Sequence, residues 1–282
     1  MSFENLKNWI GRTEETSDQA CVAPLKGLAA TLDHAEPPWG SDTVPPLGHW
    51  LYFLPQALQR DISEDGHPKR GGFLPPVPLP RRMWAGSRVE FHVPIVAGTP
   101  IERLSTISAV EHKSGKSGDL VFVTVEHSIS NQGRLALTEV QDIVYKEAPP
   151  PGQAAPAAPA TSAEARRADW TRTVTPDPVL LFRFSALTFN GHRIHYDRPY
   201  ALEVECYPGL VVHGPLTATL LMDLFLRHHP GARVLSCSIR GRQPLFDTHP
   251  FTLCGNQTEN GAEMWALDKD GQVAMTVGVV AQ

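Results

Sequence analysis

The sequence predicts an α+β fold built from two similar units, each with antiparallel strands that curl around a helix. Three features of the chain support this prediction. One amphipathic helical segment is followed by short strands of alternating hydrophobicity, the two halves repeat each other weakly, and a tract rich in proline and alanine separates them. At 282 residues the chain is long enough for two cores of ordinary size.

A long helix is predicted at residues 215–229, because apolar side chains recur there at helical spacing. Pro215 suits the first turn of a helix, and Pro230 followed by Gly231 ends it. The residues on the apolar face are Leu216, Leu220, Leu221, Leu224 and Phe225.

Antiparallel strands are predicted in both halves, where short alternating runs are separated by turn-forming pairs such as Asn260-Gly261 and Asp270-Gly271. We expect each half to pack its strands against one long helix. The runs are residues 234–240, 251–257, 264–267 and 273–280 in the second half, and 88–93, 120–129 and 135–145 in the first.

The halves also share two short matches in the same order. Pro94-Ile95 and Pro100-Ile101 recur 150 residues later as Pro244-Leu245 and Pro250-Phe251, and residues 133–138 recur 138 residues later as residues 271–276. We interpret both matches as duplication of an ancestral unit, with chance similarity as the alternative. The difference of 12 residues predicts an insertion in the first half, which we place in a loop around residues 112–119.

Residues 148–160 include 11 alanines and prolines among 13 residues, so this tract lacks the large apolar side chains that a core needs. We therefore predict an N-terminal domain at residues 1–147, an extended tether at 148–168 and a C-terminal domain at 169–282.

The composition excludes several classes of protein. A net charge of −5 is not typical of proteins that bind nucleic acid. No apolar run approaches the length of a membrane span, and the N-terminus lacks the pattern of a signal peptide. The four cysteines have no paired spacing, which favours reduced thiols and a cytoplasmic location. The sequence leaves open whether the chain forms a homo-oligomer.

The densest group of polar residues lies at 188–197, shortly before residues 207–215. Asn190-Gly191 indicates a turn, which places His192 and His195 on a loop or short helix ahead of the long helix. Gly214 opens the long helix, so its amide is one of the unpaired donors at a helix N-terminus. Such donors can stabilise a developing oxyanion.

These residue types suit the addition of water to a double bond that is conjugated to a thioester. The reaction needs a base, a group that positions the water, and donors for the enolate oxygen. Histidine titrates near neutral pH, so His195 is the candidate base. Asn190 is the candidate for holding the water, because an amide both donates and accepts, and Gly214 is the candidate donor to the oxyanion.

The stretch from Asn190 to His195, NGHRIH, resembles the hydration motif D-x-N-P-[LIV]-H of the MaoC-like, hydroxyacyl-thioester dehydratase type 2 family. The match places His195 on the motif histidine and Asn190 on the motif aspartate. The step Val212-His213-Gly214 is similar to the His-Gly pair that opens the central helix of these enzymes, whose glycine amide holds the thioester oxygen.

The resemblance extends through residues 48–54, 70–86, 188–197 and 207–215 to a two-domain subgroup of this family. It implies a double hot dog fold with a degenerate N-terminal half and an active C-terminal half. The implied reaction is reversible hydration of an α,β-unsaturated acyl-CoA, in particular a branched dicarboxylyl-CoA such as mesaconyl-C4-CoA or itaconyl-CoA. CoA is then part of the substrate, and the resemblance implies neither a cofactor nor a metal.

The chain departs from the motif at two positions, since Asn190 replaces the aspartate and His192 replaces the asparagine. Because an amide cannot act as an acid, His195 has to carry more of the proton transfer. The first half has no counterpart of the motif near residues 78–86, which indicates one site per chain.

Further residues are candidates for binding the substrate. His192 and His213 can orient a neighbour or cap the helix. Arginine binds phosphates and carboxylates through two hydrogen bonds, so four arginines are candidates for the CoA phosphates or the free carboxylate, with solvated surface charge as the alternative. The candidates for the acyl pocket are Thr188, Phe189 and Tyr207, and the arginines are Arg81, Arg82, Arg240 and Arg242.

Three other functions remain open at this point. The first is a β-hydroxyacyl-thioester dehydratase for longer acyl chains on CoA or acyl carrier protein, and the second is a non-catalytic acyl-CoA-binding subunit. The third is a metal site made of His192, His195, Asp197 and His213, although their spacing matches no standard metal motif.

Overall fold

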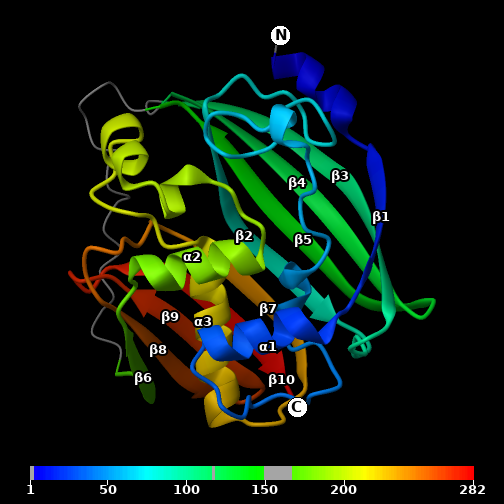
Figure 1. Ribbon diagram of the computed structural model, residues 1–282, viewed down its shortest axis with the longest axis vertical. Coiled ribbons are helices and arrows are strands. Elements are labelled where there is room, and N and C mark those ends of the chain that lie inside the picture. The colour runs from blue at the N-terminus through cyan, green and yellow to red at the C-terminus, as the bar shows by residue number, and fades with distance from the viewer. Residues whose placement is uncertain (1–2, 116–117, 149–166) are drawn as a thin grey trace.

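The computed structural model describes residues 3–115, 118–148 and 167–282, which form one antiparallel sheet of ten strands (Figure 1). The strand order is β1-β3-β4-β5-β2-β7-β10-β9-β8-β6. The α+β class predicted from the sequence is confirmed. The strands are β1 Thr13–Gln19, β2 Arg81–Phe91, β3 Pro100–Gly115, β4 Gly118–Asn131, β5 Arg134–Lys146, β6 Trp170–Val174, β7 Val234–Gly241, β8 Phe251–Thr258, β9 Gly261–Leu267 and β10 Val273–Ala281.

The sheet has the symmetry that the internal repeat predicts. From its outer edge inwards, the first half runs β1-β3-β4-β5-β2, and the second half runs β6-β8-β9-β10-β7. The halves meet where β2 pairs with β7, from Gly86 opposite Arg240 to Glu90 opposite Ser236. Main-chain hydrogen bonds therefore continue from one half into the other.

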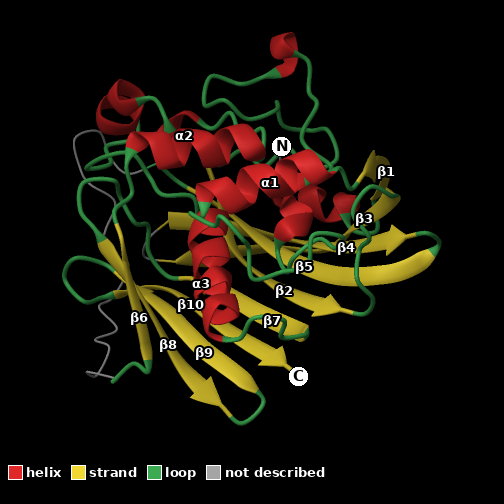
Figure 2. Cartoon of the chain, turned by 60° about the horizontal axis from the view of Figure 1, so that its bottom comes forward, coloured by secondary structure: helices red, strands yellow, loops and turns green. Residues whose placement is uncertain are grey.

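The helices gather on one face of this sheet (Figure 2). The predicted long helix is α3, Gly214–His228, which packs against β8, β9 and β10. Two shorter helices, α1 and α2, pack against each other. Their bounds and those of the short 3-10 and π helices are α1 Val22–Thr31, α2 Pro178–Leu187, η1 Phe3–Trp9, η2 Gly48–Leu51, η3 Gln59–Asp61, η4 Arg193–His195 and η5 Tyr200–Val204.

The expectation of one long helix in each half is wrong for the first half. By position, α1 corresponds to α2, and residues 32–80, which correspond to the segment containing α3, include only the 3-10 turns η2 and η3. The reason is local, because these residues include ten of the chain's 26 prolines and proline blocks the interior of a helix. In its described residues the first half therefore has no counterpart of α3, and extended chain with two 3-10 turns takes its place.

The loop predicted around residues 112–119 is also wrong. β3 and β4 stay paired as far as Gly115 opposite Gly118, so the described part of this region is strand. β3 and β4 have 16 and 14 residues, whereas β8 and β9 have 8 and 7. The insertion in the first half lengthens a hairpin.

The predicted tether at residues 148–168 lies between β5, which ends at Lys146, and β6, which begins at Trp170. Residues 149–166 are outside the described residues, so the extended tether and the domain boundaries remain predictions. All four cysteines are unpaired. None of the described helices is long and apolar enough to cross a membrane.

A loop of the first half docks directly on the polar loop of the second half. The amide of Arg193 donates to the carbonyl of Asp65 at 2.9 Å. Gly66 has a φ of +91°, and a Cβ on this residue would lie 1.8 Å from the carbonyl oxygen of Gly191. Only glycine permits so close an approach between the two backbones. The position of residues 190–195 therefore depends on the first half as well as on the second.

We expect Gly66→Ala to lower the free energy of unfolding by about 3 kcal/mol, since the added methyl group has to displace backbone. Gly133→Ala is the matched control, because Gly133 also has a positive φ, +73°, but has no atom within 4 Å of its Cβ position. Its cost is about 1 kcal/mol from backbone strain. Urea unfolding of both variants measures the difference, and equal losses would contradict the docked arrangement.

Candidate functional site

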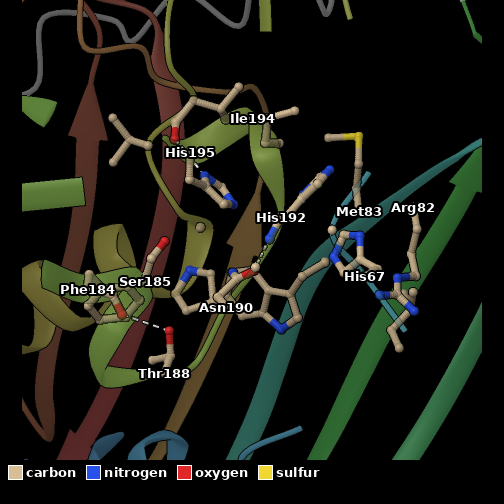
Figure 3. Close-up of a pocket in the computed structure, with 18 of the residues that line it drawn as sticks. His67, Arg82, Met83, Phe184, Ser185, Thr188, Asn190, His192, Ile194 and His195 are labelled. Carbon is tan, nitrogen blue, oxygen red and sulfur yellow. Dashed lines mark hydrogen bonds between the residues drawn. The ribbon is translucent and has the colours of Figure 1, made fainter. Parts of the chain in front are cut away.

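A cavity of about 1820 Å³ lies between the two halves. The second half contributes residues 188–196, the start of α3 and the segment 241–251, and the first half contributes residues 66–74 and the β2 residues Arg82, Met83 and Trp84. Figure 3 shows several of these side chains around the cavity. The volume is large for a small ligand and suits an extended one such as an acyl-CoA.

His195 is the last residue of η4 and is only 7% exposed. Its Nδ1 lies 2.7 Å from the carbonyl oxygen of Val211. A carbonyl can only accept, so Nδ1 carries the proton and the Nε2 lone pair remains available as a base. Burial lowers the pKa of His195 to about 4, although the Val211 carbonyl opposes this shift. The imidazole is therefore neutral at physiological pH, as a base must be.

The ring of His213 packs against the ring of His195. The two rings stack with their centroids 3.6 Å apart, and Nε2 of His213 lies 2.8 Å from Oγ of Ser185. His213 is 1% exposed and does not line the cavity, so it lies behind the base and not against the substrate. Burial, together with the nearby His195 and His192, holds the pKa of His213 well below its usual value.

Asn190 lines the cavity beside His195, but part of its side chain is already engaged. Its Oδ1 accepts a hydrogen bond of 3.0 Å from the amide of His192, which closes the turn that leads into η4. The Nδ2 group is then the part of the side chain that can donate to a water in the cavity.

Gly214 is the first residue of α3 and lines the cavity. A Cβ at this position would lie 2.8 Å from Cε3 of Trp84, so only glycine lets β2 approach the helix N-terminus so closely. Trp84 packs edge-on against Trp50, whose Nε1 donates to the buried carboxylate of Glu139 at 3.1 Å. The first half thus braces the tryptophan that covers the predicted oxyanion donor.

The structure brings most, but not all, of the predicted site residues together. Arg81 is buried and paired with Glu205 at 2.9 Å, and Arg240 is exposed on β7; neither lines the cavity. The structure thus places Arg81, Arg240 and His213 outside the cavity lining, and their predicted roles in binding remain predictions. The predicted residues that do line the cavity are Asn190, His195, Gly214, Thr188, Phe189, His192, Tyr207, Arg82 and Arg242.

Sequence reasoning missed a pair from the first half, Asp65 and His67. Nδ1 of His67 lies 3.1 Å from Oδ2 of Asp65, and the backbone amide of His67 donates to Oδ1 at 2.9 Å. The His67 ring lies 4.1 Å from that of His192, which is 5.4 Å from that of His195. The compact Asp-Gly-His sequence in a proline-rich stretch was the one signal for this pair, and nothing in its spacing linked it to residue 192.

Ionisation in this histidine group is suppressed by burial. Burial lowers the pKa of His192 to about 2, with further lowering by His67 and His195. It also lowers the pKa of His67, which the hydrogen bond to Asp65 only partly offsets. Burial raises the pKa of Asp65, but the hydrogen bonds from His67 outweigh it and leave that pKa below the usual value.

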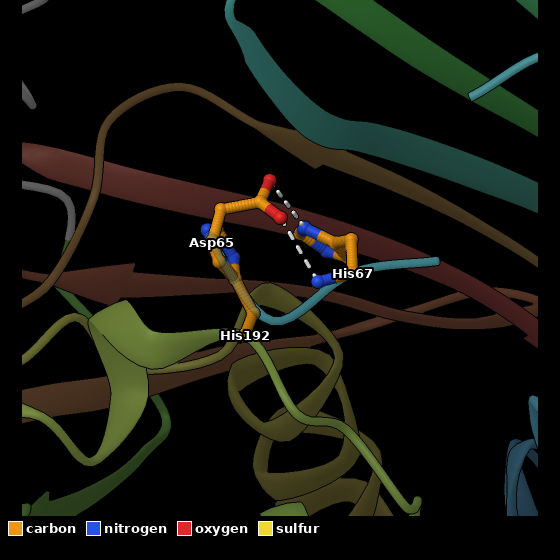
Figure 4. Close-up of side chains that lie close together, drawn as sticks. All are labelled: Asp65, His67 and His192. Atoms are coloured by element: carbon orange, nitrogen blue, oxygen red, sulfur yellow. Dashed lines mark hydrogen bonds and ion pairs between the residues drawn. The ribbon is translucent and has the colours of Figure 1, made fainter. Parts of the chain in front are cut away.

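The metal site considered from the sequence does not form. Among the described residues, the ligand atoms of His192, His195, Asp197 and His213 do not gather within 4.8 Å of one another, and Asp197 is paired with Arg193 at 2.7 Å. A different set, Asp65, His67 and His192, places its ligand atoms within 4.8 Å of one another (Figure 4). Both oxygens of Asp65 already accept hydrogen bonds from His67, so this set is stable as a hydrogen-bonded pair beside a neutral histidine.

Comparisons with known proteins identify relatives of the chain. The family model of hydroxyacyl-thioester dehydratase type 2 matches residues 47–247. The mesaconyl-C(4)-CoA hydratase of Chloroflexus aurantiacus is 50% identical over 99% of both chains. The mitochondrial hydroxyacyl-thioester dehydratase type 2 of Schizosaccharomyces pombe is 26% identical over 84% of this chain and 88% of that protein.

Solved structures confirm the predicted double hot dog fold. A MaoC-like dehydratase covers 98% of this chain and 99% of its own length, with a TM-score of 0.70 and 16% identity. A Mycobacterium tuberculosis protein described as having a double hot dog fold covers 100% of this chain and 98% of its own, with a TM-score of 0.61 and 12% identity.

The hydrogen bond to Val211 predicts the tautomer of His195. At neutral pH we expect nitrogen NMR to show a protonated Nδ1 and an unprotonated Nε2, because a carbonyl cannot donate. The ring should gain its second proton only near the lowered pKa of about 4, on the acidic side of the usual histidine range. The His195→Ala variant identifies the signal by its loss. A midpoint at the ordinary histidine value would contradict the buried, neutral base.

Proposed function

Because the chain belongs to the hydroxyacyl-thioester dehydratase type 2 family, we propose that it is a hydro-lyase that adds water reversibly to mesaconyl-C4-CoA. The choice of substrate is supported by the 50% identity to a mesaconyl-C(4)-CoA hydratase along 99% of both chains. The site supports the reaction, since a neutral histidine base, a water-binding amide and a helix-terminal amide face one cavity.

In the proposed mechanism the thioester carbonyl of the substrate accepts a hydrogen bond from the amide of Gly214. A water lies between Nδ2 of Asn190 and Nε2 of His195. His195 takes a proton from this water, and the hydroxide oxygen bonds to the β-carbon, which carries the methyl group and the free carboxylate. The electron pair of the double bond moves towards the thioester oxygen, where the Gly214 amide and the helix dipole stabilise the enolate.

The second step returns the proton. The imidazolium of His195 protonates the α-carbon, so one water is added and the enzyme is regenerated. While His195 is charged, its Nδ1–H bond to Val211 stabilises the imidazolium. Asn190 donates without exchanging a proton, which leaves His195 as the single acid and base.

A dehydratase for longer acyl chains is the second candidate, and the relative from Schizosaccharomyces pombe favours it, although with 26% identity. Dehydration is the same reaction in reverse, so the two candidates differ in the acyl group. A panel of mesaconyl-C4-CoA, itaconyl-CoA, crotonyl-CoA and a longer 2-enoyl-CoA separates them. The cytoplasmic location remains a proposal that rests on the spacing of the four cysteines, and a homo-oligomeric state remains open.

We expect His195→Ala to lower kcat for mesaconyl-C4-CoA by about 1000-fold or more, because the variant has no base for the water. Loss of the enoyl-thioester absorbance measures the rate, and circular dichroism checks the fold. The exposed His92 supplies the control, since His92→Ala leaves the cavity intact. Near-normal turnover in a folded His195→Ala protein would rule out the proposed base.

We also propose that the reaction needs no metal. Prolonged treatment with EDTA should leave kcat unchanged, because the proposed acid, base and oxyanion donor are all protein groups. A loss of activity that zinc restores would contradict this proposal and make Asp65, His67 and His192 the first candidates for holding the ion.

A further inference from the structure

The proposed substrate has a feature that the family motif does not address. In mesaconyl-C4-CoA the free carboxylate is attached to the carbon that receives the hydroxyl group. A receptor for this carboxylate therefore has to lie next to the water held by Asn190 and His195. Building on the proposed function, we infer that Arg82 is this receptor and that it selects dicarboxylyl-CoA over monocarboxylic acyl-CoA substrates.

The strand geometry places Arg82 at the right distance from the thioester site. Arg82 and Trp84 are two residues apart on β2, so their side chains share one face of the strand about 7 Å apart. Trp84 is the residue against which Gly214 packs. In the substrate, three carbon–carbon bonds separate the thioester carbon from the carboxylate carbon, roughly 4 Å in an extended chain. The long side chain of Arg82 covers the remaining distance.

A second line of contacts leads from the catalytic base to the same side chain. His195, His192 and His67 follow one another, with ring centroids 5.4 and 4.1 Å apart, and Figure 3 shows Arg82 beside His67. The charge of Arg82 acts on both His67 and His192. Arg82 thus lies at the end of the row of histidines that begins at His195.

Arg82 differs from its neighbours in that no carboxylate of the described residues offsets its charge, although its side chain also interacts with the Tyr145 hydroxyl. It is half-buried, lines the cavity, and forms no ion pair with a carboxylate of the described residues. Arg81 is paired with Glu205, and Arg70 donates to the carbonyls of Val77, Leu79 and Pro80.

Two other arginines line the cavity in settings that suit a carboxylate less well. Arg242 is exposed, where water weakens an ion pair and a CoA phosphate is the better match. Arg103 lies over the ring of Phe53 and has Glu14, Glu139 and Asp18 as acidic neighbours, which already offset its charge.

The histidines beside Arg82 carry no charge that could replace that of Arg82. His67 is tied to Asp65, and both His67 and His192 are held neutral by burial. Arg70 and Arg82 both place a permanent positive charge near His67, but Arg70 is bound to three backbone carbonyls, whereas Arg82 is half-buried and not bound in this way. An ion pair with two parallel hydrogen bonds is strongest in such a setting.

The test compares two substrates of the same shape, mesaconyl-C4-CoA and 3-methylcrotonyl-CoA, in which a methyl group replaces the carboxylate. Arg82→Met should lower kcat/KM for mesaconyl-C4-CoA by about 100-fold. For 3-methylcrotonyl-CoA the change should stay below about threefold, because no charged partner is lost. Arg82→Lys should give an intermediate loss, since lysine keeps the charge but not the paired hydrogen bonds. Arg134→Met, at an exposed position outside the cavity, is the control.

A binding measurement keeps the inference testable without turnover. Calorimetry compares the saturated analogues methylsuccinyl-CoA, with the thioester at C4, and isovaleryl-CoA. The inference expects a preference for methylsuccinyl-CoA that disappears in Arg82→Met. If this preference is present but no enoyl-CoA is hydrated, the proposed function fails and the carboxylate receptor stands. Equal losses for both ligands, as a phosphate contact would cause, or no loss for either overturns the inference.

Discussion

The site depends on the hydrogen bond between Nδ1 of His195 and the carbonyl of Val211. This bond selects the tautomer of His195 that leaves Nε2 as a base. Its acceptor, Val211, lies only three positions before Gly214 in the chain. The amide of Val211 in turn donates to the carbonyl of Ile194 at 2.9 Å. The base and the oxyanion donor are therefore held by residues 211–214, because Val211 forms hydrogen bonds with both Ile194 and His195 of η4. Their separation is set by backbone and not by flexible side chains.

The two halves contribute different parts of the site, because in the described part of the chain only the second half has a long helix. The second half keeps α3 and with it the helix terminus at Gly214. The first half has a proline-rich segment where that helix would lie, and its extended chain supplies the wall that faces the chemistry. The Asp65–His67 pair comes from this segment, and Trp84 comes from the neighbouring strand β2. Extended chain at this place lines a cavity that is large enough for an extended ligand.

Hydrophobic periodicity was enough to predict α3 and most strands, and a six-residue motif indicated Asn190 and His195, both of which line the cavity. Gly214 followed from its place at the start of a helix. The pairing of loop 63–68 with residues 190–193 could not be predicted, because a contact across more than a hundred residues leaves no periodic signal. The sequence also could not show which of Arg81 and Arg82 faces the cavity, since two successive arginines do not reveal which face of the strand is buried. The helix expected in the first half was inferred by symmetry, which the prolines between residues 37 and 80 override.

The pairing of β2 with β7 has a mechanical consequence. Because the ladder of hydrogen bonds runs through the boundary between the halves, they cannot swing apart as two rigid bodies without breaking main-chain hydrogen bonds. Exchange of a ligand falls to the loops around the cavity, and the walls keep a constant spacing during the reaction cycle. A rigid cavity of this kind selects ligands by their length. The walls lose their conformational entropy when the chain folds, so little of it remains to be lost on binding.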